Sequence, residues 1–303
     1  TKSEINVMMT AGMATVSGGV FAAYIGFGIS AIHLISASLM AAPTAILIAK
    51  IIYPETENPQ TLGTSIAQIK VADVNAFEAI CNGCSKGCNI NVDHRKEKYK
   101  DDMIYRFRPR TNRAVNGWFM CDYGRLSYEN DATNRFTTAL INKNETNISN
   151  AIINIFKELS SHDNKLILLS PNLSYEEMIN VKALADKLNI KLSGYSPNTF
   201  DESFADDWLK KADKTANRAS FKELQIDETK EFFEKALNEA KTIFVLENSY
   251  FEDKLNLLEN KKLISLFSHH CLTVGNSDIA VPVASFYEKS GSYINCDGIR
   301  QKV

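Results

Sequence analysis

The sequence predicts a composite fold: a transmembrane-type helical hairpin, then a small cysteine-rich subdomain, then an α/β domain with a mostly parallel sheet. Three observations support this prediction. Residues 5–49 contain no Asp, Glu, Lys or Arg, whereas the chain after Tyr53 is polar and charged. Four of the six cysteines fall within residues 81–121. From residue 165 onward, short apolar runs of strand length alternate with helical patterns, which is typical of βαβ units.

The apolar segment is long enough to form two membrane helices. Residues 5–27 and 31–52 each exceed the length of about 20 residues that a helix needs to cross a bilayer. Small residues recur at every fourth position in the first helix, at Ala14, Gly18, Ala22 and Gly26. Such a row lets another helix approach closely. A buried hairpin in a soluble core is the alternative, but the charge-free composition favours insertion of residues 5–52 in a membrane.

Six short runs in the first 77 residues carry a resemblance to a known family. They are Ser3-Glu4, Met9–Thr15, Ala22–Gly28, Ala37–Pro43, Tyr53–Glu57 and Asp73–Phe77. Together these runs resemble a stretch of the concentrative nucleoside transporters. In that family the substrate-binding hairpins lie outside this stretch, and their Gly-Gln-Thr-Glu motif is absent here. The resemblance therefore implies a transporter fragment, residues 1–77, that carries no nucleoside site by itself.

The cysteines Cys81, Cys84, Cys88 and Cys121 follow the pattern C-x2-C-x3-C-x32-C. Thiolate ligands favour zinc, copper(I) or iron–sulfur clusters. Zinc sites usually arise from two C-x2-C pairs, whereas here three cysteines share one turn and the fourth returns alone. That arrangement suits a cubane cluster, which takes one thiolate at each corner. The spacing predicts a [4Fe–4S] site with these four ligands, with a zinc ribbon or four unrelated thiols as the alternatives.

The neighbours of the motif are expected to tune it. Gly83 and Gly87 allow the backbone to wrap closely around an inorganic core, and Asn82 and Ser85 could donate hydrogen bonds to sulfur. Seven basic residues would favour the thiolate form; they are Arg95, Lys96, Lys98, Arg106, Arg108, Arg110 and Arg113. Cys296 has no cysteine close to it in the sequence, and we expect a small core residue there.

A second resemblance rests on six runs: Cys81–Ile90, Tyr105–Arg110, Val115–Arg125, Ala212–Arg218, Asp278–Pro282 and Glu288–Gln301. Over residues 78–303 the chain resembles the large subunit of the bacterial NADH-quinone oxidoreductases (complex I). That family is part of the molybdopterin oxidoreductase superfamily, with its 4Fe-4S and Mo/W bis-MGD-type domains. The resemblance implies one [4Fe–4S] cluster beside a truncated α/β domain of molybdopterin oxidoreductase type.

Two departures from the catalytic members of that superfamily concern the active site. Those members place a lysine after the fourth cysteine, where this chain has Tyr123. They also ligate molybdenum or tungsten through a later Cys, selenocysteine or Ser, but no cysteine occurs between Cys121 and Cys271. Ser170 and Ser174 are the candidates for a serine ligand of that metal. Bound molybdopterin is therefore not expected, and an oxidoreductase of formate dehydrogenase or nitrate reductase type is kept as an alternative function.

The α/β part is predicted from periodicity and capping residues. The predicted strands are residues 165–170, 190–195, 242–246 and 263–267. The predicted helices are residues 175–188 after the N-cap Ser174, 228–240 after the N-cap Asp227, and 251–258. Ser170, Gly194 and Asn248 should then lie at the carboxyl ends of their strands, where ligands bind in such sheets.

These expectations divide the chain into residues 1–77, 78–135 and 136–303, as a chimera whose join lies between Phe77 and Cys81. The expected function is that of an electron-transfer subunit fragment of a respiratory NADH dehydrogenase (quinone), not catalytic by itself. The alternative from another class is a nucleoside transporter fragment. Expected partners are other subunits of a membrane-associated complex on the cytoplasmic side of the bacterial inner membrane. A net charge of −2 argues against nucleic acid.

Overall fold

The computed structural model describes residues 75–96 and 102–303, which fall within one compact unit of the chain. The membrane helices predicted within residues 5–52 lie outside the described residues, as do residues 1–74 of the transporter-like segment. Across the two described ranges, no helix combines the length and the apolar composition that a bilayer crossing requires.

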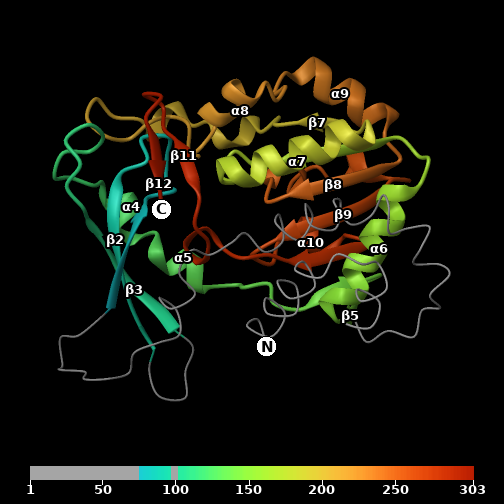
Figure 1. The fold of residues 1–303 in the computed structure, drawn as a ribbon, viewed down its shortest axis with the longest axis horizontal. Helices are drawn as coiled ribbons and strands as arrows, with labels where there is room; N and C mark the ends of the chain where they lie inside the picture. Colours follow the sequence, from blue (N-terminus) through green and yellow to red (C-terminus); the bar gives the residue numbers. More distant parts are fainter. Residues whose placement is uncertain (1–74, 97–101) are drawn as a thin grey trace, which may run out of the picture. The chain divides into compact units, whose positions relative to one another are not determined.

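The first element is a three-stranded antiparallel sheet in the order β1-β2-β3 (Figure 1). Its strands are β1 (Asn75–Ile80), β2 (Asn89–Lys96) and β3 (Asp102–Pro109). Strands β1 and β2 form a hairpin whose last pair is Ile80 with Asn89, so residues 81–88 form its loop. Strand β1 continues without a break across the predicted boundary at residue 77, where Phe77 pairs with Val92.

Two short helices, α4 (Asp122–Leu126) and α5 (Tyr128–Ala132), follow this sheet and contact β3. A small core forms beside the hairpin loop and includes Phe107, Met120 and Tyr287. Tyr287 belongs to a 3-10 turn, η5 (Phe286–Glu288), far along the chain. The cysteine-rich subdomain therefore completes its core with a residue from the carboxyl-terminal part of the chain.

The larger sheet has seven strands in the order β5-β4-β10-β9-β8-β6-β7 (Figure 1). The strands are β4 (Ala139–Ile141), β5 (Asn144–Thr146), β6 (Lys165–Leu169), β7 (Lys191–Ser193), β8 (Thr242–Leu246), β9 (Lys262–Phe267) and β10 (Ile279–Pro282). The four pairings from β10 to β7 are parallel. The two pairings at the β5 edge are antiparallel.

Helices and short turns connect these strands. The helices are α6 (Ile148–Ser160), α7 (Tyr175–Leu188), α8 (Ala219–Leu224), α9 (Lys230–Glu239) and α10 (Leu272–Gly275). Further 3-10 turns are η1 (Pro197–Thr199), η2 (Glu202–Phe204), η3 (Ser249–Phe251) and η4 (Leu255–Leu258). A separate two-stranded sheet, β11 (Ser292–Ile294) with β12 (Arg300–Lys302), ends the chain.

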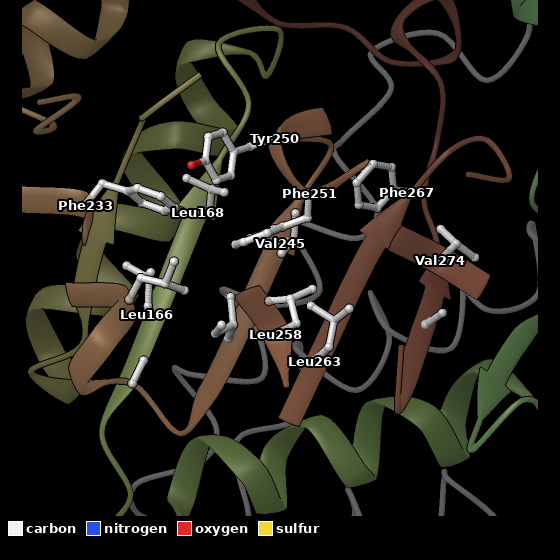
Figure 2. Close-up of a cluster of buried hydrophobic side chains, with 14 of the residues drawn as sticks. Leu166, Leu168, Phe233, Val245, Tyr250, Phe251, Leu258, Leu263, Phe267 and Val274 are labelled. Atoms are coloured by element: carbon white, nitrogen blue, oxygen red, sulfur yellow. The ribbon is translucent and has the colours of Figure 1, made fainter. Parts of the chain in front are cut away.

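The core of the larger sheet forms because its central strands are apolar on both faces. Every residue of β6 and β8 is buried, as expected for parallel strands covered on both sides. Leu166 lies opposite Ile243, and Ile243 lies opposite Leu263 on the next strand. Helix α9 adds Phe233, Ala236 and Leu237 to the same cluster. Figure 2 shows Leu166, Leu168, Val245 and Leu263 on neighbouring strands with Phe233 beside them.

The sequence predicts helix α7 at the residues where it forms. Ser174 is its N-cap, and a reciprocal hydrogen bond to Glu177 completes a capping box. The other predicted helix start is wrong by two residues: the N-cap of α9 is Thr229, not Asp227. The Asp227 carboxylate accepts hydrogen bonds from the Thr229 backbone N–H at 2.8 Å and hydroxyl at 2.6 Å. Asp227 thus stabilises the turn before the helix.

The helix predicted at residues 251–258 is also wrong. The segment forms the end of η3 and the separate turn η4. A helix of two turns is marginal by itself, and two 3-10 turns suffice to bury Phe251 and Leu258. The four predicted strands are confirmed, although β7 is limited to Lys191–Ser193.

Candidate metal centre

The loop of the β1–β2 hairpin presents three of the four predicted ligands. The Cys81 N–H donates to the Cys88 carbonyl at 2.8 Å and closes the loop, and the Gly87 N–H donates to the Cys84 carbonyl at 3.2 Å. Gly87 has a φ of +60°, a conformation that glycine adopts without strain. The side chains of Cys81, Cys84 and Cys88 are all buried, as a result of this folded-back loop.

The fourth predicted ligand arrives through a turn that is fixed by asparagine side chains. The Asn116 side chain accepts from the Asn89 N–H at 3.0 Å and donates to the Phe119 carbonyl at 2.9 Å. Cys121 then forms the N-cap of α4, and its sulfur accepts a hydrogen bond from the Gly124 N–H at 3.4 Å. Cys121 is only partly buried, in contrast to the other three cysteines.

Cys81, Cys84, Cys88 and Cys121 line one cavity. The space between its walls is about 280 Å³, including its opening to solvent. The other residues that line it are Gly83, Gly87, Met120, Leu209 and Gly124. In the described part of the chain, no group of three or more His, Cys, Asp or Glu side chains is arranged so that it could hold a metal ion. Four thiols around one cavity nevertheless fit a cubane, because each corner of the cluster takes its own thiolate.

Two glycines keep the wall of the cavity thin. A Cβ atom on Gly124 would lie 2.8 Å from the Cys81 sulfur, closer than real side chains approach. A Cβ atom on Gly83 would lie 3.4 Å from the same sulfur and 3.2 Å from the Tyr123 ring. The Gly83 N–H donates to the Cys81 sulfur at 3.4 Å. Backbone N–H groups directed at sulfur are the donors that tune iron–sulfur clusters.

Burial dominates the protonation of the three loop thiols. It raises the pKa of Cys81 to about 12 and raises the pKa of Cys84 and Cys88 above the ordinary value. Hydrogen bonds from the backbone of Lys211 and Lys86 act in the opposite direction on the pKa of Cys84. The thiols are therefore protonated at neutral pH until a metal displaces the protons.

That the arginines near the motif favour the thiolates stays a prediction; three of these arginines have acidic partners. Arg106 and Arg108 bind the buried carboxylate of Asp93 at 2.5 and 2.7 Å, and Arg110 lies 3.2 Å from Glu78. Three guanidinium groups thus share two carboxylates within the β-sheet. Lys98, another predicted member of this group, lies outside the described residues.

Parts of the chain far from the motif hold the cysteine loop in place. The Ser85 N–H donates to the Asp213 carbonyl at 2.8 Å, and Leu209 lines the cavity. From the β11–β12 hairpin, the Gln301 side chain donates to the Gly87 carbonyl at 2.9 Å. Asn295 donates to the Lys86 carbonyl at 3.2 Å. The sequence alone does not assign these residues to the site, although three of them belong to the resemblance runs at 212–218 and 288–301.

That Asn82 donates to sulfur stays a prediction, since the bond shown for its side chain is one that its oxygen accepts from the Tyr287 hydroxyl at 2.9 Å. Cys296, predicted as a core residue, is exposed. Its backbone N–H donates to the Ser85 carbonyl at 2.7 Å, so its position supports the loop while its thiol faces outward.

The carboxyl ends of the parallel strands are occupied by hydrogen bonds within the chain. Asn248, after β8, donates to the Leu169 carbonyl at 2.6 Å and to the Tyr195 carbonyl at 3.3 Å. The Ser170 hydroxyl accepts from the Asn172 N–H at 3.1 Å. Gly194, after β7, packs so closely on Phe221 that a Cβ atom there would lie 2.4 Å from the ring. Ser170, Gly194 and Asn248 thus each follow a strand, as predicted.

Comparison with known families identifies two segments. The Molybdopterin oxidoreductase Fe4S4 domain matches residues 75–130, and the C-terminal domain of the Na+ dependent nucleoside transporters matches residues 33–93. The two matches overlap at residues 75–93, which include β1, the loop with its three cysteines and the first five residues of β2. The Fe4S4 match implies a 4Fe–4S cluster.

Curated proteins similar to this chain are nucleoside transporters. Solute carrier family 28 member 3 of Rattus norvegicus is 39% identical over 132 residues, and that of Mus musculus is 46% identical over 132 residues. Each alignment covers 43% of this chain and 18% of the relative. Nucleoside permease NupC of Helicobacter pylori is 47% identical over 89 residues, or 29% of this chain and 20% of the permease. The chain thus spans about a fifth of the length of these relatives.

Proposed function

We propose that this chain is an electron-transfer fragment of a respiratory NADH-quinone oxidoreductase, similar to the large subunit of bacterial complex I, with one [4Fe–4S] cluster. The observation that carries the proposal is the cavity lined by Cys81, Cys84, Cys88 and Cys121 within the segment that matches the Fe4S4 domain. A cluster bound by these thiolates would supply one-electron redox chemistry. The chain supplies the ligands, the N–H donors and a largely buried site.

The contacts of three side chains favour an electron-transfer role over molybdopterin catalysis. The ring of Tyr123, in the place of the catalytic lysine, packs edge-on against Phe204 with centroids 4.8 Å apart. Ser174, a candidate metal ligand, is fully buried and forms the capping box with Glu177. Ser170 is buried at the β6 end and accepts a local hydrogen bond. None of these three groups is positioned as a free ligand.

The proposed setting is a multisubunit NADH dehydrogenase on the cytoplasmic side of a bacterial inner membrane. Residues 5–52 would be inserted in the membrane, as nucleoside transporter relatives match the amino-terminal part of the chain. NADH, flavin and quinone would bind other subunits. In this setting the chain is a carrier of electrons and not the catalyst by itself.

Anaerobic reconstitution of the full chain with iron and sulfide, in mild detergent, tests the cluster. We expect about four irons per chain, a visible absorbance that dithionite bleaches, and an electron spin resonance signal in the reduced state. Cys121→Ala should lower the iron content and abolish the signal, whereas Cys296→Ala should leave both unchanged. Stoichiometric zinc without a reducible chromophore would contradict the proposal.

A second candidate function is nucleoside transport by a larger assembly that contains the transporter-like segment. The match at residues 33–93 favours it, whereas the missing substrate motifs in residues 1–77 count against transport by this chain alone. Uptake of labelled uridine by proteoliposomes that contain the full chain tests whether the chain transports nucleosides without further subunits. Sodium-dependent uptake above that of empty vesicles would support it, and uptake equal to that of empty vesicles would exclude it for this chain.

A further inference from the structure

Several exposed apolar side chains lie close in sequence to the fourth cysteine. Eleven large apolar side chains are exposed in the described residues, and six of them lie between residues 103 and 126. Four of the six flank Cys121 in the sequence: Trp118, Phe119, Tyr123 and Leu126. We call these four side chains, together with Arg113 and Arg125, the Cys121 face. Since Cys121 is the one proposed ligand that is only partly buried, this face adjoins the exposed side of the candidate site.

The exposure of the two adjacent aromatic residues is built into the fold. The carbonyl of Asn112 accepts hydrogen bonds from the N–H groups of residues 115, 116 and 117, and Gly117 has a φ of +55°. The Asn116 side chain then bonds the carbonyls of Arg110 and Phe119. This rigid turn directs Met120 into the cavity while the side chains of Trp118 and Phe119 remain more than half exposed. A rigid aromatic side chain loses little entropy when a partner covers it.

One cationic side chain lies near each of two of these aromatic rings. The Arg113 guanidinium lies 5.8 Å from the centre of the Trp118 ring, and the Lys214 ammonium lies 5.6 Å from the centre of the Tyr123 ring. Arg113 and Arg125 belong to the Cys121 face and Lys214 lies beside it, whereas the one acidic residue among residues 113–126 is Asp122, 3.9 Å from Arg125. The Cys121 face is therefore positive on a chain that is negative overall. Aromatic residues and arginine beside an apolar centre are the composition of protein interfaces.

We infer that the Cys121 face is the docking surface for an acidic electron-transfer protein. The inference rests on the proposed function, because it assigns the route by which that cluster exchanges electrons. A partner with carboxylates around its own redox centre would match the charge of this face and would be steered toward Cys121. Docking would bring the partner's redox centre close to Cys121, so that a cluster held by the four cysteines could exchange one electron with it, one centre being oxidised as the other is reduced.

The two tryptophans of the chain allow a direct test. Trp208→Phe leaves Trp118 as the sole tryptophan, so that the fluorescence reports on this residue alone. The reconstituted full chain is titrated with a plant-type [2Fe–2S] ferredoxin, an acidic protein, at low ionic strength. We expect a saturable change in the fluorescence of Trp118. The apparent affinity should fall about tenfold between low salt and about 0.2 M salt, because charge attraction is screened.

Charge reversal tests the arginines. Arg113→Glu with Arg125→Glu should weaken docking at least tenfold without changing the iron content or the visible spectrum. The matched control is Lys182→Glu with Lys230→Glu, which reverses two positive charges on α7 and α9 and should leave docking unchanged. An unchanged Trp118 response in the Arg113→Glu, Arg125→Glu variant would overturn the inference. So would equal binding of a basic cytochrome c, or a Trp118 response to anionic lipid vesicles but not to ferredoxin.

Different results would contradict the proposed function and the docking surface. An iron content far below four per chain would overturn the proposed function. A chain with its full iron content that shows no salt-dependent response of Trp118 to ferredoxin would overturn the docking surface alone. The fluorescence of Trp118 and the iron analysis are independent measurements on the same sample, so each result is assigned without ambiguity.

Discussion

Gly124 contacts the sulfur of Cys81 so closely that a Cβ atom on the glycine would lie 2.8 Å from it. Gly124→Ala should therefore displace Cys81 and accelerate loss of the cluster by about tenfold or more, since overpacking typically costs about 1–3 kcal/mol. The half-life of the visible absorbance in the presence of a chelator measures the effect. Gly275→Ala is the control, because nothing lies within 4 Å of a Cβ atom there. Equal half-lives for the two variants would contradict the prediction.

Gln301 connects the last strand to the cysteine loop. Its side chain donates to the Gly87 carbonyl at 2.9 Å and accepts from the Asn89 side chain. Gln301→Ala should lower the free energy of unfolding by about 1–3 kcal/mol, because buried polar groups lose their partner. Urea unfolding of the full chain provides the measurement. Asn276→Ala, which removes an exposed side-chain amide, should change the free energy by less than about 0.5 kcal/mol.

Glu177 and Lys289 form a buried ion pair, with the ammonium 2.8 Å and 2.9 Å from the two carboxylate oxygens. Both side chains are only 4% exposed. Lys289→Met should destabilise the chain by about 3–5 kcal/mol, because it leaves an uncompensated charge in the interior. Adding Glu177→Gln should recover part of that loss, since the carboxylate that paired with Lys289 is then replaced by a neutral amide, whose oxygen can still accept from the Ser174 N–H.

An exposed ion pair serves as the control for this prediction. Lys182 lies 3.2 Å from Asp186 on the surface of α7, and Lys182→Met should cost less than about 0.5 kcal/mol. Urea unfolding curves of the four proteins give the comparison. If the double variant is less stable than Lys289→Met alone, the loss comes from packing and not from the buried charge.

The sequence is sufficient for features that depend on neighbours along the chain. The spacing of the cysteines places three of them in one loop, and the β1–β2 hairpin provides that loop. Ser174 and Glu177 stand three residues apart, the separation that a capping box requires, and they form one. Continuous apolar runs likewise locate β6 and β8. In each case the local pattern contains the physical cause of the structure.

Features that depend on distant contacts cannot be predicted in this way. Leu209 and Gln301 reach the candidate site from 88 or more residues beyond Cys121, and nothing in their own sequence neighbourhood indicates this contact. The misassigned helix at residues 251–258 has a related cause. Helical periodicity is present there, but Glu252 uses its carboxylate to bond the N–H groups of Leu272 and Thr273. Tertiary contacts thus determine the shape of a segment too short to form a stable helix alone.

The pKa of Asp93 predicts how the free energy of unfolding depends on pH. Burial of its carboxyl acts to raise the pKa, but hydrogen bonds from Arg108 and Arg106 outweigh burial and leave the pKa of Asp93 below the ordinary value of 3.8. A lowered folded-state pKa means that the unfolded chain binds the proton more tightly. The stabilisation from Asp93 is therefore fully present above the ordinary pKa of 3.8. It is lost as the pH falls through the folded-state pKa.

Comparison of the wild type with Asp93→Asn isolates this contribution, because the other carboxyl groups titrate alike in both proteins. At pH 7 the variant should be less stable by about 1.5–3 kcal/mol, the typical value of hydrogen bonds to a charged group. This difference in the free energy of unfolding, the gap, should stay constant down to about pH 5. It should narrow below about pH 3.8 as Asp93 of the wild type is protonated. Urea unfolding between about pH 3 and 7 measures it. Asp253→Asn, which alters an exposed carboxylate, should show almost no gap at any pH. A gap for Asp93→Asn that remains unchanged at about pH 3 would show that shape, and not charge, makes Asp93 stabilising.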